Sequence, residues 1–493
     1  MSEQTDSKHL IKVNLRGGIV AAGDLLDILN AAEKAGIEKV SLGNRQQLFL
    51  SVAQEQLEDL EHEFSIADID FEIGTDIYPN IVSSYVSEDI FSTSNWLREG
   101  VYKDIMDLFD TKPKLKINLA DNNQTFIPFF TGNLNFIASD TSNYWHLHIR
   151  FPKTNIFYIW PTLIYTEDIS ALSLDIEKVI LGNKSHFYDQ PAIDGNLLFL
   201  EISSDKKVTR NPEEQLILPD FQLPYYEGFN KYDDKYWLGI YKRNEEYSVA
   251  FLKDVCAVCL QSRIGQINTT PWKSIIIKGI SAEERKRWNW ILAKHRINVR
   301  HASNELNWQI EDNCDYALKL KNHLVRQFDI NDVRTFKLCF AIKVNPKTGL
   351  FGSVIIRKRL EDQEEIFDIL HTRDFNPNSK DFVTYKEEVP LDNLPSTLVE
   401  LCDYFYELQT NGNSLSAVNW DKNEDIKTEE APVLVYQCTH CQTVYDPFYG
   451  DSLNNIPAGT PFKKLDENYC CQMCEAPKSD FIEVDKNSLV DSI

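Results

Sequence analysis

Residues 436–484 read YQCTHCQTVYDPFYGDSLNNIPAGTPFKKLDENYCCQMCEAPKSDFIEV, and this stretch carries the clearest structural signal in the chain. Two C-x-x-C pairs, Cys438 with Cys441 and Cys471 with Cys474, flank a segment that contains Pro and Gly. Each pair can form a tight turn whose two sulfur atoms face one point, so four thiolates can hold one metal ion tetrahedrally. A module this small buries little apolar surface, and we expect the metal to supply much of its folding free energy.

The spacing of these cysteines leaves the metal open, because tetrahedral sulfur coordination suits both iron and zinc. The segment resembles rubredoxins over nearly its whole length. The resemblance lies in Tyr436, Tyr445, Asp446-Pro447, Gly450-Asp451, Pro457, Gly459-Thr460, Phe462, Lys478 and Phe481. It implies one iron ion that cycles between Fe2+ and Fe3+ in a tetrathiolate site, with the aromatic side chains packed beneath it. Zinc stays the alternative metal.

Four positions depart from the rubredoxin pattern, including Tyr469 where a Trp is usual and Gln472 where a Pro is usual. Rubredoxins usually have Gly directly after each C-x-x-C, whereas this chain has Gln442 and Glu475. Glycine adopts positive φ without strain, so either these two residues take up the left-handed conformation or the turns differ. Cys470 directly precedes Cys471. Because adjacent side chains point apart, we expect Cys470 to be a free thiol rather than a ligand.

Composition places limits on the partners of the chain. A formal net charge of -24 argues against a broad nucleic-acid surface or an anionic membrane. The sequence has no stretch long enough for a membrane span and no apolar leader near its start, so we expect a cytoplasmic protein. Ten cysteines in such a compartment should be reduced, and clustered pairs then indicate metal or redox sites.

Two regions before the metal module repeat one order of elements. Residues 8–80 suggest a strand (IKVNL), a Gly-Gly turn, a helix, two strands and a Glu-rich helix. Residues 231–300 contain the strand YWLGIYKR, the helix SVAFLKDVCAVCLQ, the strand KSIIIKGI and the helix SAEERKRWNWILAKH. Ser281 and Glu284 have the spacing of a capping box at the start of the last helix. The recurrence predicts a duplicated α+β scaffold with pseudo-twofold symmetry.

The rest of the chain completes the predicted domain plan. Residues 81–230 mix a helix with aromatic, alternating strands and form an α+β region. Residues 301–410 form an α/β region, in which FKLCFAIKV and FGSVIIRK are expected to pair around a turn at 345–349. Residues 411–432 are polar and acidic, which is typical of a flexible linker, and 433–486 form the metal module.

The duplicated region resembles the ferredoxin-like half-domains of nitrite/sulfite reductases, in IKVNLRGGIVAAGDLLDILNAAEKAGIEKVSLGNRQQLFL and again in TPWKSIIIKGI. The resemblance implies a scaffold built around a sirohaem and a four-iron cluster. That family ligates its cluster through C-x5-C and C-x3-C pairs. Neither spacing occurs among the cysteines before the linker, Cys256, Cys259, Cys314, Cys339 and Cys402. Asp121 and Asn122 stand where such cysteines are expected, so we expect neither sirohaem nor the cluster.

Other candidate sites have simpler interpretations. Cys256 and Cys259 lie on an amphipathic helix and are expected to pack in a core. His146 and His148 share one face of a strand, but no third metal ligand is evident. Several basic residues could bind haem carboxylates or an oxyanion, although we expect them to be solvated: Arg16, Arg45, Arg263, Lys273, Lys278 and Arg300.

The leading hypothesis is an electron-transfer protein, in which a rubredoxin centre is carried on a degenerate nitrite/sulfite reductase-like scaffold. The expected partner is a redox protein, with a nitrite or sulfite reductase as the candidate. The linker favours this function because tethering raises the effective concentration of a carrier at a docking site. Two alternatives stay open: a catalytic sirohaem reductase with a built-in rubredoxin donor, and a zinc-ribbon binding or assembly protein. No catalytic residue is assigned.

Overall fold

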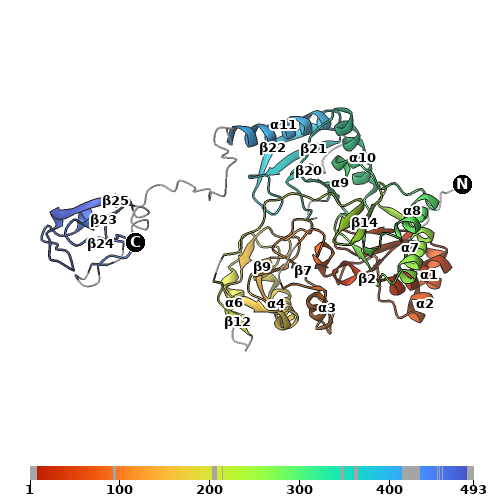
Figure 1. Ribbon diagram of the computed structural model, residues 1–493, viewed down its shortest axis with the longest axis horizontal. Coiled ribbons are helices and arrows are strands. Elements are labelled where there is room, and N and C mark those ends of the chain that lie inside the picture. Colours follow the sequence, from red (N-terminus) through yellow and green to blue (C-terminus); the bar gives the residue numbers. More distant parts are fainter. Residues whose placement is uncertain are drawn as a thin grey trace. The chain divides into compact units, whose positions relative to one another are not determined.

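The computed structural model describes residues 8–92, 96–202, 208–213, 215–345, 349–359, 365–412, 434–451, 454, 456–457 and 459–485. The chain divides into two compact units, Met1–Asn411 and Gly412–Ile493, and each is described by itself (Figure 1). Nearly all of the predicted linker at 411–432 lies outside the described residues. Among the residues that are described, no helix is long and apolar enough to cross a membrane.

The large unit contains the predicted duplication. The first copy is β1 (Lys8–Val13), β2 (Ile19–Ala21), α1 (Ala22–Lys34), β3 (Lys39–Leu42), β4 (Leu48–Ala53) and α2 (Gln54–Ile66). The second copy follows the same order with β14 (Lys235–Tyr241), β15 (Glu246–Ser248), α7 (Val249–Gln261), β16 (Gln266–Thr269), β17 (Ser274–Ile280) and α8 (Arg285–Lys294). The four helices lie together at one end of the large unit (Figure 1).

The two copies exchange a strand. The short strand before the first helix of each copy pairs with the sheet of the other copy, so β2 joins β16 and β15 joins β3. The resulting sheets have the orders β15-β3-β4-β1-β5 and β13-β14-β17-β16-β2. The exchanged strands β15 and β2 lie at one edge of these sheets, and β5 (Glu72–Ile73) and β13 (Gly228–Tyr232) lie at the other. One apolar core, which includes Leu29, Leu50, Phe251 and Ile277, is therefore shared by both copies.

Helix α1 shows how the sequence sets these elements. Leu25, Ile28, Leu29 and Ala32 are buried and recur at the spacing of one helix face. The helix ends because Gly36 has φ of 74°, and its N–H donates to Glu33 O at 2.9 Å. Such a left-handed residue is a common way to satisfy the last carbonyl groups of a helix.

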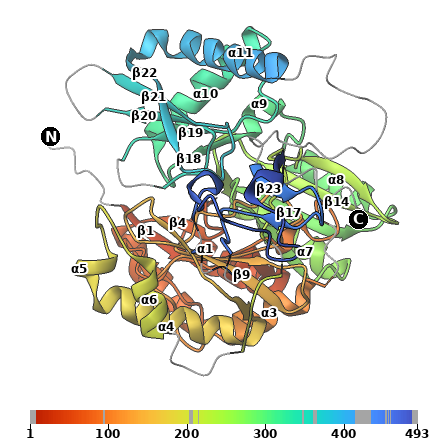
Figure 2. The same ribbon diagram turned by 90° about the vertical axis from the view of Figure 1, so that its left-hand side faces the viewer.

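The middle of the large unit is a mixed sheet with the order β12-β11-β9-β8-β7-β6, and β10 pairs with β9. Its strands are β6 (Val82–Ser83), β7 (Ile117–Ala120), β8 (Leu134–Ala138), β9 (Tyr144–Arg150), β10 (Phe157–Ile159), β11 (Leu163–Tyr165) and β12 (Thr209–Arg210). The helices that accompany it are α3 (Glu99–Asp107), α4 (Ile169–Gly182), α5 (Lys184–Phe187) and α6 (Gly195–Ile202). Leu147 and Ile149 of β9 share a core with Leu172 and Ile176 of α4. Helices α4 and α6 lie side by side (Figure 2).

A further sheet of the large unit has the order β18-β19-β20-β21-β22. Its strands are β18 (Trp308–Ile310), β19 (Phe340–Lys343), β20 (Val354–Lys358), β21 (Ile366–Thr372) and β22 (Phe382–Pro390). The helices of this part are α9 (Ser303–Leu306), α10 (Asp315–Ile330) and α11 (Leu394–Gly412). Side chains of α10 and α11 share one apolar core with the strands, as Leu324, Phe340 and Leu398 illustrate.

Two local predictions are wrong. The strands β19 and β20 do pair, but in parallel rather than as a hairpin. The Glu311 carboxylate accepts from the N–H groups of Val344 and Asn345 at 2.9 and 2.7 Å, groups that a hairpin turn would have used. Helix α8 begins at Arg285, and the predicted capping box before it is only half formed: the Ser281 hydroxyl accepts from the Glu284 N–H at 3.4 Å. The Glu284 carboxylate instead accepts from the Ser262 hydroxyl at 2.8 Å, so it does not close the box.

The small unit is built on a three-stranded sheet with β23 in the middle. The strands are β23 (Leu434–Cys438), β24 (Val444–Tyr445) and β25 (Phe481–Asp485). Aromatic rings fill its small core, and the Tyr436 and Phe462 rings stack with centroids 4.2 Å apart. The Tyr469 hydroxyl donates to Asp451 Oδ2 at 3.0 Å, which satisfies a polar group in this core. The aromatic residues of the rubredoxin pattern therefore form the base beneath the cysteines.

Candidate metal centre

The four predicted cysteines lie together in the small unit. The Sγ atoms of Cys438, Cys441, Cys471 and Cys474 all lie within 4.8 Å of one another. Cys441 Sγ is 3.4 Å from Cys471 Sγ, and Cys438 Sγ is 3.6 Å from Cys474 Sγ. Cys438 and Cys471 are buried, whereas the other two reach the surface. Four converging sulfur donors suit a tetrathiolate iron site.

Two turns of the same design hold these sulfur atoms. In the first, the Gln442 N–H donates to Cys438 O at 2.9 Å, and the Cys438 N–H donates to Thr443 O at 2.9 Å. In the second, Glu475 and Ala476 make the same bonds with Cys471, at 2.9 and 2.8 Å. The repeated backbone pattern explains why each C-x-x-C pair presents both of its sulfur atoms toward one point.

Gln442 and Glu475 adopt the left-handed conformation that glycine usually provides. Their φ angles are 61° and 55°. A residue with a Cβ in this conformation is strained by about 1–2 kcal/mol. The sequence left open whether these two residues are left-handed or the turns differ. The structure has the usual turns, and Gln442 and Glu475 are strained.

Changing either strained residue to glycine is expected to stabilise the small unit. Gln442→Gly removes the Cβ strain of about 1–2 kcal/mol, and the greater unfolded-state entropy of glycine offsets about 0.5–1 kcal/mol of this. In urea unfolding of the full chain, the absorption of the metal centre should therefore be lost at a higher urea concentration in Gln442→Gly than in the wild type. Gln472→Gly is the control, because Gln472 is exposed and its φ is not positive. A lower midpoint for Gln442→Gly would contradict the strain.

Hydrogen bonds and proton sharing set the ionisation of the cluster. The hydroxyl and N–H of Thr443 lower the pKa of the Cys441 thiol to about 6. The Ala476 N–H lowers the pKa of the Cys474 thiol. The hydrogen bonds that Cys474 makes with the neighbouring sulfur atoms outweigh this effect, and its pKa is raised to about 12. A metal ion needs thiolates, so its binding displaces the protons that the metal-free cluster keeps.

Cys470 lies outside the cluster, as expected. Its side chain is exposed, and its thiol donates to Asn468 O at 3.4 Å. Among the residues that the structure describes, the four clustered cysteines form the one group of three or more side chains that could hold a metal ion.

The cysteines of the large unit do not form a cluster site. Cys256 and Cys259 are buried in the core of α7, as predicted, and burial raises the pKa of Cys256 to about 12. Cys339 and Cys402 are buried in other cores. Asp121 is also buried, and its carboxylate accepts from the Ser92 hydroxyl. The side chains present therefore do not fit a four-iron cluster, nor the bridging thiolate that a sirohaem shares with one.

His146 and His148 are on one face of β9, but they do not gather a third ligand among the described residues. Burial lowers the pKa of both, and that of His148 falls to about 4. The His148 ring lies against Phe130, with ring centroids 5.2 Å apart. These histidines are neutral groups packed within the unit.

The prediction that the basic residues are solvated is wrong for some of them. Arg45 is buried and donates to the carbonyl oxygens of Asn80 and Ile117 at 2.7 and 2.9 Å. Lys273 is buried and donates to Glu245 Oε2 at 2.6 Å. These groups were misjudged because their partners lie far away in the sequence. Lys278 is half-buried and donates to backbone oxygens, whereas Arg263 and Arg300 are exposed as expected.

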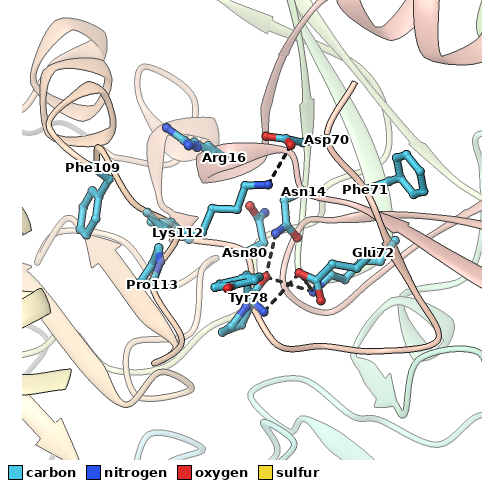
Figure 3. Close-up of a pocket in the computed structure, with 13 residues that line it drawn as sticks. Asn14, Arg16, Asp70, Phe71, Glu72, Tyr78, Asn80, Phe109, Lys112 and Pro113 are labelled. Atoms are coloured by element: carbon cyan, nitrogen blue, oxygen red, sulfur yellow. Dashed lines mark hydrogen bonds and ion pairs between the residues drawn. The ribbon is translucent and has the colours of Figure 1, made fainter. Parts of the chain in front are cut away.

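A small recess of the large unit contains Arg16 together with Lys12 and Lys112 (Figure 3). Lys112 points toward Asp70, and their charged atoms are 2.8 Å apart. Lys12 pairs with Glu72 at 3.2 Å. These lysine charges are already neutralised, so the recess offers little to an anionic ligand.

A second group of cations was not recognised from the sequence. Lys116 and Arg150 lie near Arg45, and Lys343 and Lys380 lie near Arg150. None of these four forms an ion pair with a described carboxylate. Burial and the nearby Arg45 lower the pKa of Lys116 to about 8, and burial and Arg150 lower that of Lys380 to about 7. The five come from separate strands and loops, so no sequence spacing could have indicated them.

Known proteins match both units. Residues 435–481 match the rubredoxin family model. A probable rubredoxin HupI from Bradyrhizobium diazoefficiens is 39% identical over 64 residues, which cover 13% of this chain and 93% of that protein. A probable rubredoxin from Methanothermobacter thermautotrophicus is 38% identical over 60 residues, 12% of this chain and 95% of its own. The high molecular weight rubredoxin of Moorella thermoacetica is 47% identical over 49 residues, 10% of this chain and 21% of that protein.

The likeness of the large unit is one of fold. The structure of the Mycobacterium tuberculosis NirA protein matches with a TM-score of 0.63 and 12% identity, covering 83% of both chains. The predicted nitrite/sulfite reductase-like fold is therefore confirmed. At this identity the match shows the fold alone.

Proposed function

Because the chain belongs to the rubredoxin family through its C-terminal module, we propose that it is an electron carrier whose single iron ion is held by Cys438, Cys441, Cys471 and Cys474. The observation that supports this most directly is the convergence of their four sulfur atoms within 4.8 Å. An iron ion in such a site exchanges one electron by cycling between Fe2+ and Fe3+.

The surroundings of the cysteines are suited to carrying electrons. Cys438 and Cys471 sit above the aromatic core, which keeps water from that side of the site. Cys441 and Cys474 are at the surface, where their sulfur atoms give an electron a short route to a docked protein.

The metal content of the intact chain tests this proposal. Purification from iron-replete cells should give one iron per chain and a red protein that bleaches on reduction. A colourless protein with one zinc would overturn the proposal and leave a zinc-binding module in its place.

We propose a redox protein as the partner, with a nitrite or sulfite reductase as the candidate. The chain is strongly acidic, so a basic surface on the partner would speed the encounter. The reduced chain should transfer electrons to such a reductase at a rate that falls steeply with added salt. Transfer no faster than to an unrelated acceptor would count against this partner.

A second candidate function concerns the large unit. The cations Arg45, Lys116, Arg150, Lys343 and Lys380 favour an anionic ligand, as a catalytic reductase would need. Expression with a sirohaem supply tests this candidate. Haem absorption in the purified chain that disappears in Arg150→Met would support it, and a chain without haem absorption would exclude a sirohaem enzyme.

A further inference from the structure

The two cysteine turns differ at one position. Thr443 follows Gln442 in the first turn, and Ala476 follows Glu475 in the second. Both residues offer a backbone N–H to the preceding cysteine sulfur. Thr443 also has a hydroxyl, and its Oγ1 lies 3.1 Å from Cys441 Sγ. Ala476 has no group that could do the same, so the donors around the two surface sulfur atoms are unequal.

The position of Thr443 favours a persistent hydrogen bond. Thr443 is half-buried beside the exposed Cys441, and its carbonyl oxygen is held by the Cys438 N–H at 2.9 Å. Its β-branched side chain has few rotamers to lose when it is fixed. The hydroxyl is therefore held in place against the sulfur atom, whereas a water molecule at the same surface would have to be immobilised.

We propose that the Thr443 hydroxyl donates a hydrogen bond to the Cys441 thiolate and thereby raises the reduction potential of the centre. The inference rests on the iron-dependent function proposed above. Reduction adds one electron to a centre whose four thiolate ligands already make it negative. Hydrogen bonds become stronger as the charge on the acceptor grows. A hydrogen bond to the sulfur atom therefore stabilises the reduced centre, which is more negative, more than it stabilises the oxidised centre. Thr443 is thus a positioning residue that tunes the potential through Cys441.

Redox titration of the full chain, with metal analysis and a visible spectrum for each variant, tests this role. Thr443→Val keeps the shape of the side chain and removes the donor. At a fixed potential it should lower the ratio of ferrous to ferric protein by about 3- to 10-fold, since only the difference in strength of the hydrogen bond between the two redox states counts. A tenfold change corresponds to 59 mV for a one-electron couple.

Two further variants separate tuning from structure. Thr443→Ser retains a hydroxyl and should restore most of the ratio. Ala476→Thr adds a hydroxyl beside Cys474 and should shift the ratio in the opposite direction, which keeps the test valid even where Thr443→Val loses iron. An iron-loaded Thr443→Val that titrates like the wild type would overturn the role of Thr443. A chain that contains zinc and has no redox-active absorption would overturn the proposed function, and the tuning role with it.

Discussion

Cys471→Ser is expected to abolish the metal centre and unfold the small unit while the large unit keeps its own thermal transition. Cys471 is buried in the cluster, and its Sγ lies 3.4 Å from Cys441 Sγ. A serine hydroxyl stays protonated near neutral pH and does not replace a thiolate ligand. Structural tetrahedral sites contribute about 10–16 kcal/mol of binding free energy, which is folding free energy for a module of this size.

The measurements are the iron content, the visible spectrum and a calorimetric scan of the full chain. Cys470→Ser is a matched control, because Cys470 is the adjacent residue, is exposed and lies outside the cluster. It should retain one iron per chain and a normal spectrum. Loss of iron from Cys470→Ser would contradict the ligand assignment, and loss of the large unit's transition in Cys471→Ser would contradict the separation of the two units.

Glu245→Ala is expected to destabilise the large unit by about 3–5 kcal/mol, because it leaves the buried Lys321 ammonium without its counter-charge and leaves Lys273 with only Asp312, at 3.5 Å. Glu245 accepts from Lys273 at 2.6 Å and from Lys321 at 3.0 Å. The two lysine side chains are 4% and 1% exposed, so water cannot replace the carboxylate. Urea unfolding followed by intrinsic fluorescence measures the loss.

The neighbouring Glu246→Ala is the control. Glu246 pairs with Lys39 at 2.8 Å, but both side chains are at least half exposed. Such surface pairs contribute about 0–1 kcal/mol, and the unfolding midpoint should barely move. Equal effects of the two substitutions would contradict the importance of the buried network.

The effect of Glu245→Ala should depend on pH. Burial raises the pKa of Glu245, but Lys321 and Lys273 lower it more, so the pKa lies below its ordinary value of 4.5. A carboxyl whose pKa is lower in the folded state adds stability above its unfolded pKa and loses it as pH falls through the folded pKa. The difference in unfolding free energy between wild type and Glu245→Ala should therefore shrink as pH falls below that ordinary value.

The sequence alone was sufficient to predict features that depend on residues close together in the chain. The C-x-x-C spacing identified the cysteine cluster, since each turn needs four consecutive residues to bring two sulfur atoms together. The apolar spacing of α1 and α7 predicted helices that the structure contains, and their recurrence predicted the duplication. The absence of glycine at Gln442 and Glu475 left two outcomes open, strained residues or different turns, and the structure contains the strained residues.

Features that depend on distant partners were not predictable in this way. The strands β19 and β20 pair in parallel, and the residues after β19 donate to Glu311, which lies outside both strands. Arg45 could be buried because Asn80 and Ile117 supply carbonyl acceptors from other loops. The cations around Arg45 and Arg150 likewise come from segments that are far apart in the sequence. No short-range pattern contains that information.

The exchanged strands also affect how this protein can fold while it is being synthesised. Val20 of β2 pairs with Ile267, and Val40 of β3 pairs with Tyr247, so each half of the duplication needs the other to complete its sheet. While the first half is emerging, the edge of β3 lacks its partner and Leu29 and Leu50 lack part of their shared core. Unpaired strand edges and exposed apolar surface favour aggregation, and contacts so distant in sequence form slowly. The first half of the duplication is therefore most prone to aggregation until the second half has been synthesised.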